Sequence, residues 1–180
     1  MSAVAATAVA WFTAGPGVVK TPALTPEQRL RAMVLWPKDA CKTTSFDRTS
    51  LRPAPAGYRA ALTCATSPGR DQIAFYQLFG SAAPLDRAFR RLASTANYTG
   101  DPGAELVACP GADDAGVAGW NADATTRGER VCLQRARADG VIEHWLVWTQ
   151  PGLRLVAELV DVRSLKRAHD EWGKALAHSA

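Results

Sequence analysis

The sequence predicts an α+β fold in which amphipathic helices pack on one side of a mainly antiparallel sheet. Three observations support this class. Short strand-like runs are separated by turn residues, apolar residues recur elsewhere at helical spacing, and four cysteines fall into two equally spaced pairs. The 180 residues are 47% hydrophobic and 21% charged, a composition that can bury one core of ordinary size.

The first 19 residues are apolar and carry no charged side chain. A spanning helix needs about 20 apolar residues, and Gly15-Pro16 interrupts this stretch. A signal peptide has a basic start, which this stretch lacks. Three interpretations stay open: the last part of a transmembrane helix, a degenerate signal peptide, or the apolar N-terminus of a soluble protein. Residues 20–24 are predicted to be a linker, and residues 25–178 a single extracytoplasmic domain.

The domain is predicted to begin with a helix and a hairpin. Thr25-Pro26-Glu27-Gln28 combines an N-cap threonine, a proline in the first turn and a glutamine at the capping-box position. This helix should end near Trp36, because a proline follows. Strand-like runs at 58–66 and 72–79 flank turn-forming residues 67–70, which predicts a β-hairpin.

A second helix is predicted from about Pro84, because apolar residues recur there at helical spacing: Leu85, Ala88, Phe89 and Leu92. Its other side carries Arg87, Arg90 and Arg91. These arginines offer a face for an anionic partner, such as a wall polymer or phospholipid headgroups. The alternative is an ordinary solvated helix face.

The second half is predicted to hold five strands and a terminal helix. Asp139-Gly140 lies between two strand-like runs and predicts a hairpin. Pro151-Gly152 predicts a type II turn, and Asp161 is the expected cap of a helix that runs to about Ala177. The predicted strands cover 105–109, 117–121, 130–136, 141–149 and 153–160.

The cysteines indicate two disulfides in an oxidising compartment. Between Cys41 and Cys64 lie 22 residues, as between Cys109 and Cys132. Zinc sites use ligands two to four residues apart, and no such pair of cysteines occurs. Four cysteines allow three pairings, of which we favour Cys41 with Cys64 and Cys109 with Cys132, since each closes a local loop. The matching order of cysteines, hairpin and helix in both halves also suggests an internal duplication of a ββα unit.

Nothing in the sequence predicts an active site, a metal site or a bound cofactor. Nucleic-acid binding is not expected, because the net charge of +4 is dispersed. A hydrolase would need His144 or His169 to meet a carboxylate and a nucleophile in the fold, and no G-x-S-x-G motif is present. Trp36 and Trp120 are the candidates for lining a binding groove, although tryptophans more often pack in a core.

The order of cysteines, tryptophans and strands over residues 25–176 resembles a known family. The segments that carry this resemblance are Ala61–Cys64 with Phe75–Phe79, Gly119-Trp120 with Gly128–Cys132, and His144–Thr149 with Glu171-Trp172. They are similar to the extracytoplasmic domains of actinobacterial receptor-type serine/threonine kinases and to related stand-alone secreted or membrane-anchored proteins. The resemblance implies a sensor or binding domain with disulfides and no catalysis of its own. The Gly-rich loop, the His-Arg-Asp loop and Asp-Phe-Gly of a kinase are missing from this chain.

We therefore expect a non-catalytic extracytoplasmic sensor or binding domain of a membrane-associated protein. Its partner would be an unidentified extracellular ligand or protein, and its N-terminus a possible membrane tether. The alternative is a stand-alone secreted protein that binds or inhibits another protein. A hydrolase is the third hypothesis.

Overall fold

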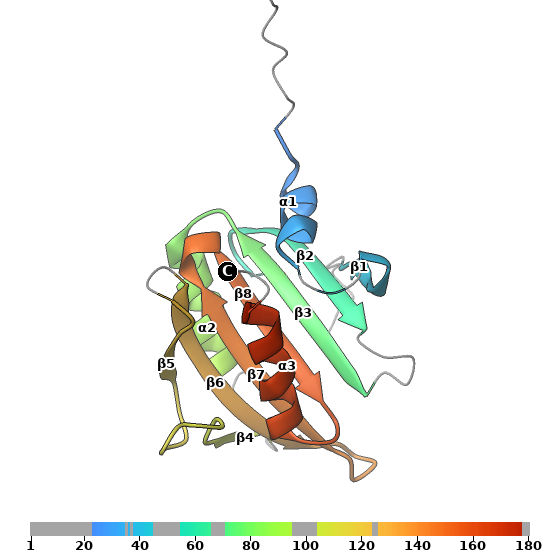
Figure 1. The fold of residues 1–180 in the computed structure, drawn as a ribbon, viewed down its shortest axis with the longest axis vertical. Helices are drawn as coiled ribbons and strands as arrows, with labels where there is room; N and C mark the ends of the chain where they lie inside the picture. Colours follow the sequence, from blue (N-terminus) through green and yellow to red (C-terminus); the bar gives the residue numbers. More distant parts are fainter. Residues whose placement is uncertain are drawn as a thin grey trace, which may run out of the picture.

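Eight antiparallel strands form one sheet in the part of the chain that the computed structural model describes, which is residues 23–34, 36, 38–44, 55–65, 71–94, 104–123 and 126–177 (Figure 1). The strand order is β1-β2-β3-β8-β7-β6-β4, and β5 also pairs with β6. Strands of the two halves meet where β3 pairs with β8. The apolar segment 1–19, residues 20–22 of the linker and the 67–70 turn lie outside the described residues.

Each predicted strand and α-helix is present, and β1 is added at one edge. The strands are β1 (Cys41–Thr43), β2 (Tyr58–Ala65), β3 (Gln72–Phe79), β4 (Ala104–Val107), β5 (Ala118–Asn121), β6 (Arg127–Ala136), β7 (Ile142–Gln150) and β8 (Leu155–Asp161). The helices are α1 (Pro26–Met33), α2 (Ala82–Ala93) and α3 (Leu165–Ala177), with short 3₁₀ helices η1 (Lys38–Ala40) and η2 (Pro151–Leu153). The α+β class and the antiparallel sheet are confirmed.

The helices cover both faces of the sheet, so the prediction that they pack on one side is wrong. Leu30 of α1 and Trp172 of α3 belong to one buried cluster, whereas Leu85 and Phe89 of α2 belong to another on the opposite face. The reason lies in the central strands. Strand β8 (Leu155–Asp161) is buried at every position, and a strand that is buried on both faces needs a cover on each.

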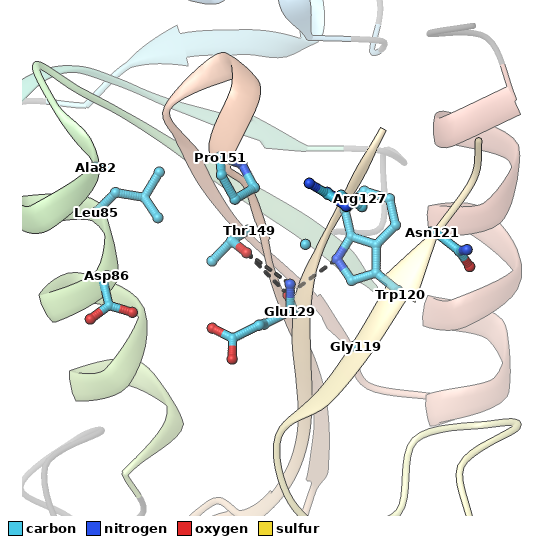
Figure 2. Close-up of a pocket in the computed structure, with 11 residues that line it drawn as sticks. Ala82, Leu85, Asp86, Gly119, Trp120, Asn121, Arg127, Glu129, Thr149 and Pro151 are labelled. Atoms are coloured by element: carbon cyan, nitrogen blue, oxygen red, sulfur yellow. Dashed lines mark hydrogen bonds between the residues drawn. The ribbon is translucent and has the colours of Figure 1, made fainter. Parts of the chain in front are cut away.

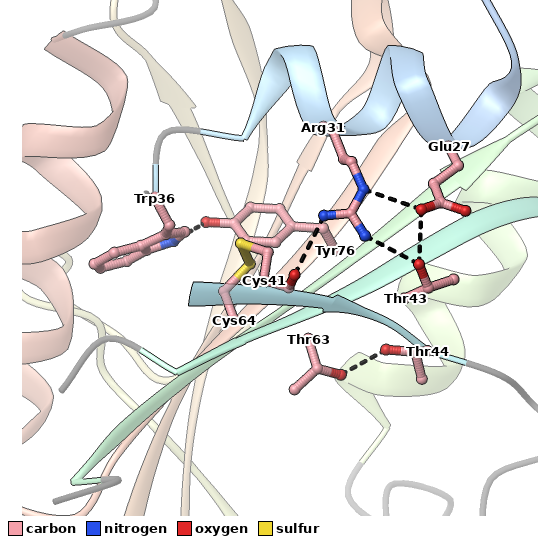
Figure 3. Close-up of a disulfide and its surroundings, with 9 residues drawn as sticks. All are labelled: Glu27, Arg31, Trp36, Cys41, Thr43, Thr44, Thr63, Cys64 and Tyr76. Atoms are coloured by element: carbon pink, nitrogen blue, oxygen red, sulfur yellow. Dashed lines mark hydrogen bonds and ion pairs between the residues drawn. A yellow bond between two sulfur atoms is a disulfide. The ribbon is translucent and has the colours of Figure 1, made fainter. Parts of the chain in front are cut away.

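Helix α1 is tied to the edge strand β1 (Figure 3). Its capping box forms as predicted, with Thr25 Oγ1 accepting from the backbone N–H of Gln28 at 3.2 Å and Gln28 Oε1 accepting from that of Thr25 at 2.9 Å. Arg31 pairs with Glu27 at 3.0 Å and donates to the carbonyl of Cys41. The hydrogen bond from Thr43 and the Arg31 guanidinium lower the pKa of Glu27. The helix ends at Met33, slightly before the predicted end near Trp36.

Two local predictions around β8 are corrected. Pro151-Gly152 does not form a type II turn: Pro151–Leu153 is a 3₁₀ helix, and the left-handed position falls on Arg154 (φ 58°). Asp161 is not the cap of α3. Its Oδ1 accepts from the backbone N–H groups of Arg163 and Ser164, and Ser164 Oγ accepts from that of Arg167. The cap is therefore Ser164, three residues further along, and Asp161 fixes the turn that leads to it.

The favoured disulfide pairing is confirmed. Cys41 joins Cys64 and Cys109 joins Cys132, each with a sequence separation of 23. The chain-entropy model gives each such loop roughly 3 kcal/mol of stabilisation. Among the residues with a described position, no cysteine is free. Disulfides of this kind indicate an oxidising environment.

The internal duplication is only partial. The first half runs β1, β2, β3 and then α2, whereas in the second half η2 and β8 separate the β6–β7 hairpin from α3. The two helices also lie on opposite faces of the sheet. A strict repeat of a ββα unit is therefore not present. Within the described ranges, no helix has the length and apolar character needed to cross a membrane.

Candidate functional site

A cleft of about 700 Å³ opens between the first turns of α2 and the strands β5, β6 and β7 (Figure 2). One wall comes from α2, the other from β5 and β6, and Pro151 borders it after the end of β7. Its lining residues are Ala82, Leu85, Asp86, Gly119, Trp120, Asn121, Arg127, Gly128, Glu129, Thr149 and Pro151. Ligand sites are usually clefts of this size, with mostly apolar walls and a few polar groups.

The regular pairing of β6 with β7 ends at the cleft. The last registered pair of these strands is Arg130 with Trp148, and residues 127–130 pair with β5 on the other side. Beyond that pair, Thr149 Oγ1 accepts from the backbone N–H of Glu129 at 2.9 Å. A Cβ at Gly128 would lie only 2.0 Å from the carbonyl oxygen of Thr149. Glycine at position 128 therefore allows the close contact that closes the floor of the cleft.

The charged groups of the cleft largely balance. Asp86 and Glu129 lie on opposite walls, and Arg90 pairs with both, at 3.6 Å from Asp86 Oδ1 and 2.7 Å from Glu129 Oε1. All three side chains are partly exposed, so these pairs add only about 0–1 kcal/mol each to stability. Arg127 is exposed on the β6 side. The cleft thus offers apolar walls with both acidic and basic groups at its border.

Trp120 forms part of the cleft wall and is itself only 7% exposed. Its indole N–H donates to the carbonyl of Glu129 at 3.2 Å, and its ring meets that of Trp172 edge to face at 5.4 Å between centroids. Trp36, the other groove candidate, does not line this cleft. It lies near α1 and donates its N–H to the hydroxyl of Tyr76 (Figure 3).

Aromatic rings connect these two places through the core. Trp148 contacts both Tyr76 and Trp172 with centroids 6.1 and 6.4 Å apart, so that a row of rings crosses the α3 face from Trp36 to Trp120. Edge-to-face pairs contribute about 0.5–1.5 kcal/mol beyond their buried area. Burial raises the pKa of Tyr76 far above its ordinary value, which keeps its hydroxyl protonated. The row explains most of the tryptophan content as core packing.

The arginines predicted to form an anionic-partner face divide into two kinds. Arg90 is engaged with Asp86 and Glu129 at the cleft. Arg87 and Arg91 are exposed on α2. Sequence reasoning missed Glu129, Gly128 and Thr149, because a cleft between a helix and three strands depends on pairings that no local pattern reports.

The histidines of the hydrolase hypothesis lie elsewhere. His144 Nδ1 is 3.3 Å from Gln134 Nε2, and His169 Nε2 is 2.9 Å from Arg130 Nη1. Neither histidine lines the cleft. Over the ranges with a described position, no three His, Cys, Asp or Glu side chains are grouped so as to hold a metal ion.

The stability of the domain is expected to fall as pH falls, partly through His169. Burial and the nearby charge of Arg130 lower the pKa of His169 below its ordinary value of 6.5, against a smaller opposing effect of Asp170. The unfolded chain then takes up this proton at a higher pH than the folded chain, so acidification favours unfolding. Urea titrations between about pH 8 and pH 5 should show a shallower loss of stability for His169→Gln than for the wild type. Equal slopes would contradict the assignment.

Comparison with known proteins found no relative. No protein-family model matches the chain, and no similar curated protein or solved structure was found. The observations that bear on function are therefore the cleft, the disulfides and the distribution of charge.

Proposed function

We propose that the chain is a non-catalytic extracytoplasmic domain that binds a ligand or partner group in the cleft between α2 and β5–β6. The single observation that carries this proposal is the cleft itself. Its walls are mostly apolar. At its border lie two carboxylates, each paired with Arg90, and the exposed Arg127. Such a combination suits recognition of a small molecule or a protruding side chain.

Several features support binding over catalysis. The polar groups of the cleft are carboxylates held by Arg90, the hydroxyl of Thr149 bonded to the Glu129 backbone, and the Trp120 indole N–H bonded to the same residue. Each of these polar groups is thus engaged within the protein, Asp86 and Glu129 with Arg90, which suits a shaped recognition surface.

The extracytoplasmic setting and the sensor role rest on different grounds. The two disulfides support an oxidising compartment. The sensor role rests on the order of cysteines, tryptophans and strands that resembles kinase extracytoplasmic domains. In that role, occupancy of the cleft would be transmitted to a signalling chain, which these residues do not include.

Two neighbouring alanines allow a matched test of the cleft. Ala82 and Ala83 are both exposed in the first turn of α2, but only Ala82 lines the cleft. A tryptophan at position 82 should fill the cleft, whereas one at position 83 should leave it open. A library of small soluble aromatic acids, amines and sugars would be screened by saturation-transfer NMR against the wild type, A82W and A83W.

The proposal expects compounds that bind the wild type and A83W at equal strength and bind A82W at least about tenfold more weakly, a change of about 1.4 kcal/mol. Thermal melts of both variants show whether the fold is kept. If no compound binds A83W more strongly than A82W while both variants remain folded, the cleft is not the binding site.

A further inference from the structure

We propose that the end of the sheet where α2 begins is a docking surface for an anionic phospholipid membrane, and that Arg59 and Arg154 make its electrostatic contact. The two residues lie at the ends of different strands and are far apart in sequence. Arg59 is the second residue of β2, and Arg154 immediately precedes β8.

The fold brings the two guanidinium groups to the same peptide. Arg154 Nη1 donates to the carbonyl of Gly80 at 2.6 Å. The Arg59 guanidinium lies beside the same residue, where a Cβ at Gly80 would be 2.9 Å from Arg59 Nε. Both arginines are exposed. Two like charges held this close raise the local positive potential.

No carboxylate among the described positions forms an ion pair with Arg59 or Arg154. The acidic residues in the first turns of α1 and α2 are already engaged, since Glu27 pairs with Arg31 and Asp86 with Arg90. Within the described ranges, the positive charge at this end therefore has no acidic partner. Arginine favours phosphate oxygens, because its planar fork can donate two parallel hydrogen bonds.

The position of the N-terminal segment selects a membrane as the partner. Figure 1 shows α1, the first described helix, at the end of the sheet where β2 begins and β3 ends. The 19 uncharged, apolar residues that open the sequence are thus joined to the domain at the end that carries Arg59 and Arg154. An apolar segment and basic side chains at the same end both favour contact with an anionic membrane surface.

The test is vesicle co-sedimentation of the full 180-residue chain. Phosphatidylcholine vesicles with and without about 30 mol % phosphatidylglycerol separate the charge-dependent part of binding from insertion of the apolar segment. The variant R59Q/R154Q removes the arginine pair. The control R87Q/R91Q removes the same charge from exposed arginines of α2, which do not lie beside Gly80.

R59Q/R154Q should bind the anionic vesicles about 30-fold more weakly than the wild type, at about fivefold per arginine, and the control should differ by less than about threefold. Added salt should weaken wild-type binding and narrow this difference. Equal losses in the two variants, or equal binding of the wild type to neutral and anionic vesicles, would overturn the proposal. Compounds that bind in the cleft should bind R59Q/R154Q as they bind the wild type, because neither arginine lines the cleft, so failure of the cleft proposal and failure of this one are distinguishable.

Discussion

Gly128→Ala should lower the free energy of unfolding by about 3 kcal/mol or more. The new methyl group would lie 2.0 Å from the carbonyl oxygen of Thr149, and 2.9 Å from its carbonyl carbon and its Oγ1. The carbonyl atoms belong to the backbone of β7 in the middle of the sheet, so they cannot turn away as a flexible side chain could. Relief requires β6 to move away from β7, which breaks the bond between Thr149 Oγ1 and the Glu129 N–H. Urea denaturation with the disulfides intact measures the loss.

Gly119→Ala is the matched control for this substitution. Gly119 lies on the neighbouring strand β5 and also lines the cleft, but a Cβ there would meet no atom within 4 Å. Its stability should stay within about 0.5 kcal/mol of the wild type. A Gly128→Ala protein as stable as Gly119→Ala would show that β6 and β7 are not in close contact at this point.

Asp161→Ala should destabilise the domain by about 3–5 kcal/mol. The carboxylate is fully buried at the end of β8 and has a partner on every side. Oδ2 accepts from Gln72 Nε2 at 3.0 Å and lies 3.5 Å from Arg167 Nε, while Oδ1 accepts from two backbone N–H groups of the turn before α3. Removal takes an acceptor away from each of these donors, and Gln72 is only 2% exposed there.

Asp161→Asn separates the contribution of the turn's backbone donors from that of the Gln72 and Arg167 side chains. The amide oxygen can still accept from the turn, but the amide nitrogen cannot accept from Gln72 or Arg167. An intermediate loss of stability is expected, measured by the same denaturation and by the helical signal of α3 in circular dichroism. If Asp161→Ala unfolds at the wild-type urea concentration, the network does not hold α3 to the sheet.

The elements themselves could be predicted from local patterns. The capping box at Thr25, the apolar spacing of α2 and the Asp139-Gly140 hairpin are each determined within a few residues, and the equal cysteine gaps indicated the correct disulfides. The need for a cover on both faces was also present in the sequence of β8, where Leu155-Val156-Ala157 and Leu159-Val160 put apolar side chains on both faces. A strand that is buried on both faces needs a cover on each, and the prediction of helices on one side did not take this into account.

The cleft and the arginine pair could not be predicted in the same way. Gly128 and Thr149 meet just beyond the last registered pair of β6 and β7, and Arg59 and Arg154 both approach Gly80 only because β2 and β8 begin where β3 ends. These contacts depend on the strand order, which cannot be read from a single sequence. Of the two tryptophans that were candidates for lining a groove, Trp120 lines the cleft and Trp36 does not.

Each disulfide lies within its own half of the chain, and neither crosses the β3–β8 pairing that joins the halves. Under mechanical tension between its two ends, the domain would therefore give way at this seam before either half comes fully apart. Each disulfide would then withhold about 80 Å of contour length from the extended chain, for a separation of 23 residues. A domain anchored at one end and loaded at the other would keep two crosslinked cores from which to refold once the load is released.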